Sequence, residues 1–288
     1  MSGRIVPGPK ILLMGAEGSG KTDSIRSLIE AGLKVFCVFT EPGMEVLLDG
    51  RRGRKVYSCE EGLHWRYHPL AQPDFSDLKD NADLLNKFSF QQLKSMAPIK
   101  REKFRCFYDA MATLANMNCE RCGKSFGAAD HLEPYNEWAI VLDSLTSLSK
   151  AALYLHIGVK PAAHEGEYGT AMFNIERFIE KFVGDVPSMG IVMGHVEKEP
   201  SNVDGGLEVM VSTLGQKLAP KIPRPFSDVI LAKREVDKFF WSSTEGGHRL
   251  KTRNFAFSKE IPPTFGPVVK AWQEAVKAEA AGGSAPKP

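Results

Sequence analysis

The apolar residues of this chain are grouped in short continuous runs rather than in alternating stretches. A continuous run of four to six apolar residues is typical of a strand that is buried on both faces, as in a parallel sheet. Four such runs stand at residues 11–14, 35–39, 139–142 and 190–194. The pattern predicts an α/β fold with a mainly parallel central sheet that is flanked by helices.

A helical stripe separates the first two runs. Ile25, Leu28 and Ile29 have helical spacing, and Gly32 follows as a stop signal. A strand, a helix and a strand in this order favour parallel strands, and we expect the second strand to neighbour the first. Further strands are predicted at 228–231, 239–241 and 250–257, and a helix at 271–280.

The predicted organisation is a single domain over residues 1–280 with an insertion at about 51–137. The inserted segment is charged and weakly periodic, but Phe104, Phe107, Met111 and Leu114 would share one face of a helix. The final residues, 281–288, are expected to be disordered because they are rich in glycine and proline.

Composition narrows the class of protein only slightly. The 288 residues include 37 Lys and Arg against 35 Asp and Glu, and 43% are apolar, which excludes a disordered chain. A net charge of +2 does not by itself indicate nucleic-acid binding. Five cysteines, an odd number, and the lack of an apolar run near 20 residues favour a cytoplasmic protein with reduced thiols and no membrane segment.

The strongest chemical signal is the run 15–22, which satisfies the P-loop pattern Gly-x-x-x-x-Gly-Lys-[Ser/Thr] between a predicted strand and a predicted helix. Its glycines let backbone N–H groups face phosphate oxygens, Lys21 reaches the β and γ phosphates, and the Thr22 hydroxyl binds Mg²⁺. The predicted phosphate-binding residues are Gly15, Ala16, Glu17, Gly18, Ser19, Gly20, Lys21 and Thr22.

Three polar residues follow other predicted strands, at the edge where ligands bind in open α/β sheets. Asp143 is a candidate Mg²⁺ ligand, with helix capping as the alternative. Glu41 is a candidate for positioning or deprotonating water, with a surface turn before Pro42 as the alternative. His195 is a candidate sensor of the γ-phosphate, or a structural histidine.

Together these residues resemble the RecA fold, and more closely the small RecA-like ATPases of bacteriophages that act in single-strand annealing and recombination. The resemblance covers the P-loop and the segments 40–41, 142–144, 194–197 and 250–253, and therefore most of the chain outside the insertion. It implies ATP as the nucleotide and Glu41 as the catalytic base. His195 stands where RecA has a glutamine.

The resemblance also implies partners. Single-stranded DNA would contact two segments, 165–169 and 201–213, which correspond in position to the DNA-binding loops of RecA. It further implies a homo-oligomer, either a filament or a ring, a single-strand-binding protein as a further partner, and the host cytoplasm if the protein is encoded by a phage.

Lys251 and Arg253 form a basic-x-basic pair on a predicted late strand. Alternation along a strand would direct both side chains to one face, where two cations could meet one phosphate group. In RecA such a pair reaches the γ-phosphate of the neighbouring subunit, and the resemblance therefore implies hydrolysis at subunit interfaces. A solvated basic strand is the alternative.

Cys119 and Cys122 have the CxxC spacing of a zinc knuckle, although a second CxxC pair is missing. Cys59, His64, His68, Cys106 or His131 could complete a zinc site, and free reduced thiols are the alternative. Basic clusters at 51–55 and 100–105 could follow a DNA backbone or could simply be solvated.

The motif thus predicts a P-loop nucleotide-binding protein, and the resemblance implies an ATPase that acts on single-stranded DNA in phage-type recombination or strand annealing. Two alternatives remain open at this point. One is a nucleotide-gated regulatory or assembly module without DNA action, and the other is a ring helicase or packaging motor.

Overall fold

The computed structural model describes residues 5–50, 54–200 and 207–282. Its centre is a seven-stranded sheet in the order β3-β2-β4-β5-β1-β8-β9, in which every neighbouring pair is parallel except β8 and β9. The strands are β1 (Lys10–Gly15), β2 (Lys34–Phe39), β3 (Leu63–Tyr67), β4 (Trp138–Asp143), β5 (Met189–Gly194), β8 (Asp228–Glu235) and β9 (Lys238–Ser242). The predicted α/β class with a mainly parallel sheet is confirmed.

The four apolar runs became β1, β2, β4 and β5. The expected pairing of the first two strands is wrong, because β4 and β5 lie between β1 and β2. Runs that are apolar on both faces carry no information about which parallel strand lies next to which. The order matters for the site, since it sets the ends of β2 and β4 beside each other.

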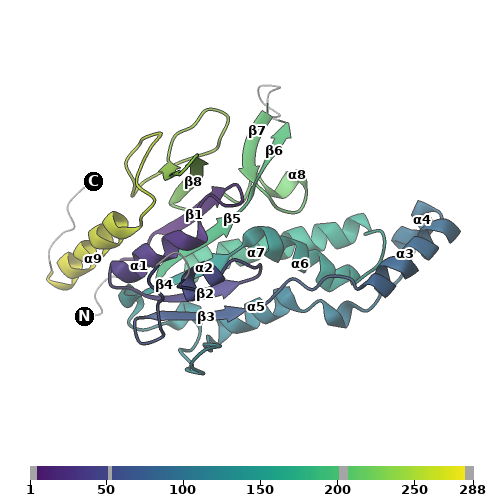
Figure 1. Cartoon of the computed structure of the whole chain (residues 1–288), viewed down its shortest axis with the longest axis horizontal. Coiled ribbons are helices and arrows are strands. Elements are labelled where there is room, and N and C mark those ends of the chain that lie inside the picture. Colours follow the sequence, from purple (N-terminus) through teal and green to yellow (C-terminus); the bar gives the residue numbers. More distant parts are fainter. Residues whose placement is uncertain (1–4, 51–53, 201–206, 283–288) are drawn as a thin grey trace.

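Successive side chains of β1 pack on opposite faces of the sheet. Leu12 and Met14 join the core beneath α5 (Cys106–Ala115), α6 (Leu145–Ile157) and α7 (Glu165–Asp185), whereas Ile11 and Leu13 join the core beneath α1 (Arg26–Glu30) and α9 (Gly266–Ala280). Figure 1 shows these helices on the two sides of the sheet. Burial on both faces explains why the strand sequences do not alternate.

The remaining helical elements are short or lie outside these two layers. They are η1 (Thr22–Ile25), α2 (Glu45–Leu48), α3 (Phe75–Lys87), α4 (Phe90–Ser95), η3 (Arg101–Lys103), η4 (Ala129–His131), η5 (Tyr135–Glu137) and α8 (Gly215–Leu218). No helix in the described part of the chain is long and apolar enough to cross a bilayer.

The segment from about 51 to 137 contributes both to the sheet and to a projection beyond it. Its strand β3 forms an edge of the central sheet, and its helices α3 and α4 reach away from the body of the molecule (Figure 1). Phe107 of α5 is buried in the core cluster that also contains residues of α6 and α7, and Met111 and Leu114 pack against that cluster. Phe104 precedes the helix and is also buried.

The strand predicted at 250–257 is wrong. Only Lys251 forms a bridge, to Val229, and the chain then bends. The cause is the buried carboxylate of Asp228, which accepts hydrogen bonds from the backbone N–H groups of Arg253 and Asn254. These bonds turn the backbone around one oxygen, so it cannot extend along the sheet. The helix predicted at 271–280 lies within α9.

The two segments expected to be DNA-binding loops differ in structure. Residues 165–169 form the first turn of α7, where His164 and Glu167 make reciprocal capping bonds, and so are not a loop. The second segment includes β7 (Leu207–Val211), which pairs with β6 (Val196–Pro200) as an antiparallel hairpin. Residues 201–206, between these strands, lie outside the described residues, as do 283–288 of the tail that was expected to be disordered.

Candidate functional site

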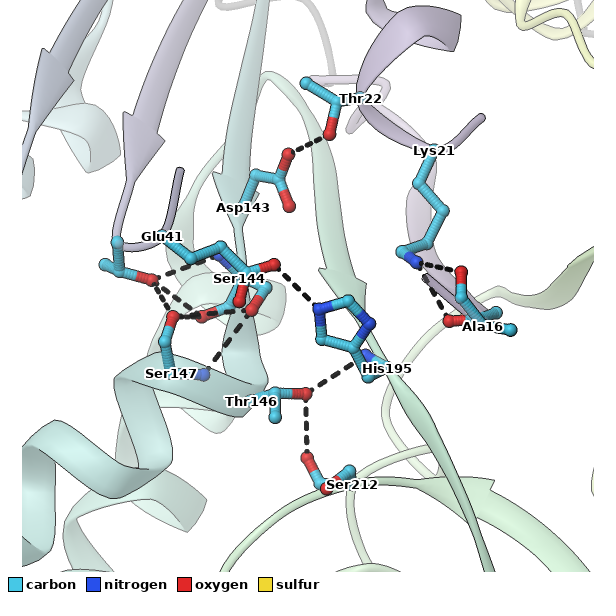
Figure 2. Close-up of polar contacts among 12 residues, drawn as sticks. Ala16, Lys21, Thr22, Glu41, Asp143, Ser144, Thr146, Ser147, His195 and Ser212 are labelled. Atoms are coloured by element: carbon cyan, nitrogen blue, oxygen red, sulfur yellow. Dashed lines mark hydrogen bonds and ion pairs between the residues drawn. The ribbon is translucent and has the colours of Figure 1, made fainter. Parts of the chain in front are cut away.

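The P-loop follows β1 and leads directly into η1 and α1. Lys21 folds back over this loop, and its Nζ donates to the carbonyl oxygens of Gly15 at 2.8 Å and Ala16 at 2.9 Å (Figure 2). Only 6% of Lys21 is exposed. Burial lowers the pKa of Lys21, while the nearby carboxylates of Asp143 and Glu41 oppose that shift. The loop therefore holds a desolvated cation at its centre.

Two glycines of the motif are required by their surroundings. A Cβ at Gly15 would lie 2.4 Å from the carbonyl oxygen of Ala232 in β8. Gly20 has a φ of +84°, which side chains rarely adopt, and a Cβ there would approach Phe239 to 2.9 Å. Glycine at these two positions lets the loop backbone take this shape, in which its N–H groups can contact phosphate oxygens.

Asp143 ends β4 with its carboxylate turned toward the P-loop. The Thr22 hydroxyl donates to Asp143 Oδ2 at 2.6 Å (Figure 2). Asp143 is only 4% exposed, and burial raises its pKa against the lowering effects of Thr22 and Lys21. Helix capping does not account for it, because Ser144 is the residue whose side chain caps α6. A carboxylate beside a hydroxyl is an oxygen pair of the kind that binds Mg²⁺.

Glu41 follows β2 and reaches across the end of β4 to His195, which follows β5. Glu41 Oε1 and His195 Nε2 are 2.9 Å apart. Burial pushes the pKa of Glu41 up, but hydrogen bonds from His195 and Ser144 and the charge of Lys21 hold it below its ordinary value. Glu41 is therefore a carboxylate at neutral pH.

The end of β2 is held by hydroxyl groups. Thr40 Oγ1 accepts from the backbone N–H of Ser144 at 3.1 Å and lies 2.5 Å from Ser147 Oγ. These bonds tie β2 to the start of α6, and they fix the backbone from which Glu41 projects (Figure 2). The sequence analysis missed this support, because isolated Ser and Thr residues carry no spacing signal.

His195 links the P-loop end of the sheet to the β6–β7 hairpin. Its backbone N–H donates to Thr146 Oγ1 at 3.0 Å, and the Thr146 hydroxyl donates to the Ser212 carbonyl at 3.1 Å. Ser212 in turn donates its backbone N–H to the His195 carbonyl at 2.8 Å. Among the described residues, His195 Nδ1 is buried without a hydrogen-bond partner.

A cavity of about 870 Å³ lies over these groups and has the size of a small-ligand site. It is lined by the P-loop, Glu41, Asp143 and His195, and it continues past Arg54, Phe239 and residues 262–264. The sequence analysis missed these last residues. They come from loops remote from the motif, and no local pattern marks them.

Lys251 and Arg253 lie near the amino ends of the parallel strands, whereas the P-loop of the same chain lies at their carboxyl ends. Asp228, which binds the backbone of Arg253, pairs with Ile11 near the start of β1, whereas Gly15 at its end pairs with Ala232. Lys251 Nζ donates to the Arg224 carbonyl at 2.8 Å, and Arg253 is exposed. Neither residue joins the cavity.

The expected basic clusters are largely neutralised within the chain. Lys100 and Lys103 pair with Asp77 and Asp74, which flank the start of α3, and Arg105 pairs with Asp109. Arg54 pairs with Asp23 at 2.7 Å, and Lys55 pairs with Glu61 at 2.7 Å. Residues 51–53 lie outside the described residues.

Cys119 and Cys122 meet two of the five residues that the sequence offered as partners. The donor atoms of Cys59, His64, Cys119 and Cys122 all lie within 4.8 Å of one another. We call these four residues the Cys/His cluster. The other three residues point elsewhere: Cys106 donates to the His68 carbonyl, His68 Nε2 contacts Thr113 Oγ1, and His131 is exposed.

No protein-family model matches the chain, and no curated protein sequence matches it. Solved structures that match include the crystal structure of the RadB recombinase. That match is 14% identical, covers 89% of this chain and 85% of the other, and has a TM-score of 0.38. The sheet flanked by helices on both faces, with a P-loop at the end of β1, gives the chain an α/β fold with a phosphate-binding motif at the carboxyl ends of its parallel strands.

Proposed function

We propose that this protein is an ATPase that binds Mg-ATP over the P-loop and hydrolyses it. The observation that carries the proposal is the buried Lys21 ammonium in a glycine-lined loop, on the same sheet edge as the Thr22–Asp143 pair and the Glu41 carboxylate. A desolvated cation strongly favours an anionic ligand, and the exchange of backbone carbonyls for phosphate oxygens would give Lys21 charged partners.

The residues fit a magnesium ion. Thr22 and Asp143 would hold it through oxygen ligands, and the ion would neutralise charge on the β and γ phosphates. Burial raises the pKa of Asp143, and a bound divalent cation would favour its charged form. The cavity beyond the loop, near Arg54 and residues 262–264, offers room for the nucleoside.

Glu41 would act as the general base that orients and deprotonates the attacking water. A general base must be ionised and within reach of the reacting atoms. The depressed pKa of Glu41 meets the first condition, and the shared cavity with Lys21 and Asp143 supports the second. His195 would hold the carboxylate in place through its Nε2.

Hydrolysis would occur between subunits, with Lys251 and Arg253 supplied to the γ-phosphate of a neighbour. Both residues lie at the other end of the strands from the P-loop of their own chain. Only a second copy of the chain could therefore place its Lys251 and Arg253 beside this P-loop. A head-to-tail contact of this kind builds a ring or a filament. Cations supplied in this way stabilise the charge of the transition state.

We further propose that the protein binds single-stranded DNA in an ATP-dependent way, in recombination or strand annealing of the phage type. The hydrogen-bonded path from Glu41 through His195 and Thr146 to Ser212 supports it, because it couples the nucleotide end to the β6–β7 hairpin. A nucleotide-gated regulatory module and a ring motor remain the rival functions.

The test measures ATP turnover and DNA binding together. We expect ATP hydrolysis that changes on addition of a single-stranded oligonucleotide, and binding of that oligonucleotide that weakens steeply between about 50 and 200 mM salt. A blunt duplex of the same length is the control. Hydrolysis without any response to single strands would favour the regulatory module, and strand displacement on a tailed duplex would favour the motor.

A further inference from the structure

The Cys/His cluster is assembled from two separate parts of the chain. Cys59 lies in the turn before β3, and His64 is the second residue of that strand. Cys119 and Cys122 come from the turn that follows α5. Three sulfurs and one imidazole nitrogen converge, which are the donor types that structural zinc sites use.

The spacing of the donor atoms fits a tetrahedral ion. Cys59 Sγ and Cys119 Sγ are 3.8 Å apart, and Cys122 Sγ and His64 Nδ1 are 3.7 Å apart. Zinc–sulfur bonds of about 2.3 Å and a zinc–nitrogen bond of about 2.0 Å require about 3.8 Å between sulfurs and about 3.5 Å between sulfur and nitrogen. A disulfide would need about 2.05 Å, so the sulfurs stand at ligand spacing.

The turn that carries Cys119 and Cys122 is shaped by its own backbone. Met117 and Gly127 are joined by a backbone hydrogen bond, and so are Cys119 and Lys124. Gly123 has a φ of +70° and lets the turn close immediately after Cys122. The turn brings both thiols close to Cys59 and His64.

The turn also covers the open edge of the sheet. The backbone N–H of Glu120 donates to the Trp65 carbonyl at 2.8 Å, and its carboxylate accepts from the Tyr67 N–H at 2.9 Å. An edge strand such as β3 otherwise exposes its backbone groups. Phe126 packs against His64 with ring centroids 4.5 Å apart and shields the imidazole.

We propose that Cys59, His64, Cys119 and Cys122 bind one zinc ion in a closed structural site that fastens the 117–127 turn to β3. All four coordination positions are filled by protein, so the ion has no open position for catalysis. Its role is to hold the turn against the outermost strand of the sheet. This inference does not depend on the proposed ATPase activity.

The test is the metal content of the full chain, purified without chelator. We expect about one zinc per chain in the wild type and far less in Cys119→Ser and in Cys122→Ser. Cys106→Ser is the matched control, because Cys106 is outside the cluster and a serine can keep the bond to the His68 carbonyl. That variant should retain its zinc.

A second measurement uses only the wild-type protein, so it tests the proposal even if the variants do not fold. Cobalt added to metal-depleted wild-type protein should give the visible absorption of a tetrahedral thiolate complex, and zinc should displace it. Wild-type protein that contains no zinc and gives no such spectrum would overturn the proposal. So would a disulfide between Cys59 and Cys119 in freshly purified protein, or equal zinc content in the wild type and both cluster variants.

Discussion

The P-loop end of the sheet and the Cys/His cluster at its β3 edge are built in different ways. Residues 15–22 are contiguous, and a strand buried on both faces fixes their position. In the cluster, Cys59 and His64 come from the outermost strand β3 and the turn before it. Cys119 and Cys122 come from a turn that follows α3, α4 and α5 in the sequence. Local sequence is enough to specify the first, whereas the second exists only once the chain has folded.

The two regions should also fail in different ways. Lys21 is buried at a cost in solvation, so its loss should remove a function and leave the fold intact. The cluster lies at an edge strand, and none of its four residues is among those that line the cavity, so its loss should weaken the fold and leave nucleotide binding intact. The predictions below test this separation.

Lys21→Ala should cause the largest effect on ATP binding. We expect ATP affinity to fall by about 100-fold or more, because each hydrogen bond to a charged group contributes about 1.5–3 kcal/mol and every 1.4 kcal/mol is tenfold. Titration calorimetry measures the affinity, and circular dichroism should be unchanged. Lys79→Ala, an exposed lysine of α3, is the control. Equal affinities in the two variants would remove the P-loop assignment.

Arg253→Ala tests whether the active site is formed by one chain or is shared between two subunits. Turnover should fall by about 10³-fold with ATP binding retained, the magnitude of a lost arginine finger. Mixing this variant with Lys21→Ala should restore part of the turnover, because each chain supplies what the other lacks. If assembled mixtures stay inactive, the active site is not shared between subunits.

Glu41→Gln should reduce turnover by about 10²-fold or more, the usual contribution of a general base. ATP affinity should change little, since the amide keeps the size of the side chain. Glu45→Gln, an exposed neighbour in α2, is the control. A variant that hydrolyses ATP at the wild-type rate would show that another group activates the water.

Removal of zinc probes the other region. A strong chelator should lower the midpoint of thermal unfolding by several degrees, because a metal that binds only the folded state stabilises it by mass action. ATP affinity measured below the transition should be retained, since β2, β4 and β5 separate the cluster's strand from β1. Loss of ATP binding in parallel with zinc would contradict the separation of the two regions.

Asp143→Asn should have the smallest effect on thermal stability, and in the opposite direction to zinc removal. Burial raises the pKa of Asp143, so its charged form destabilises the nucleotide-free fold at neutral pH. The variant should unfold on the order of 2 °C higher by calorimetry without nucleotide. Its advantage should shrink as the pH falls through the raised pKa and wild-type Asp143 becomes protonated. A variant that is less stable at pH 7 would contradict this interpretation.

The sequence predicted well what is local and poorly what depends on strand order. The P-loop, four buried strands and the polar residues Asp143 and His195 at their ends follow from apolar runs and from one motif. The position of β2 beyond β4 and β5 does not, because each of these runs is equally apolar. Glu41 still reaches the site, since all parallel strands end at the same edge.

Two further differences have particular causes. The backbone after Lys251 bends because the Asp228 carboxylate accepts two of its N–H groups, a contact that no periodicity reveals. The completion of the Cys/His cluster depends on the turn after α5 packing beside β3. Cys59 and His64 were only two of five candidates in the sequence, and folding selected between them.

In the proposed function, the P-loop binds a triphosphate at the end of β1. A crystal structure with Mg²⁺ and a non-hydrolysable ATP analogue tests it directly. We predict phosphate oxygens within hydrogen-bond distance of the backbone N–H groups of residues 18–22 and of Lys21 Nζ, with the metal beside Thr22. Nucleotide bound elsewhere, while Lys21 keeps its bonds to the Gly15 and Ala16 carbonyls, would contradict the account.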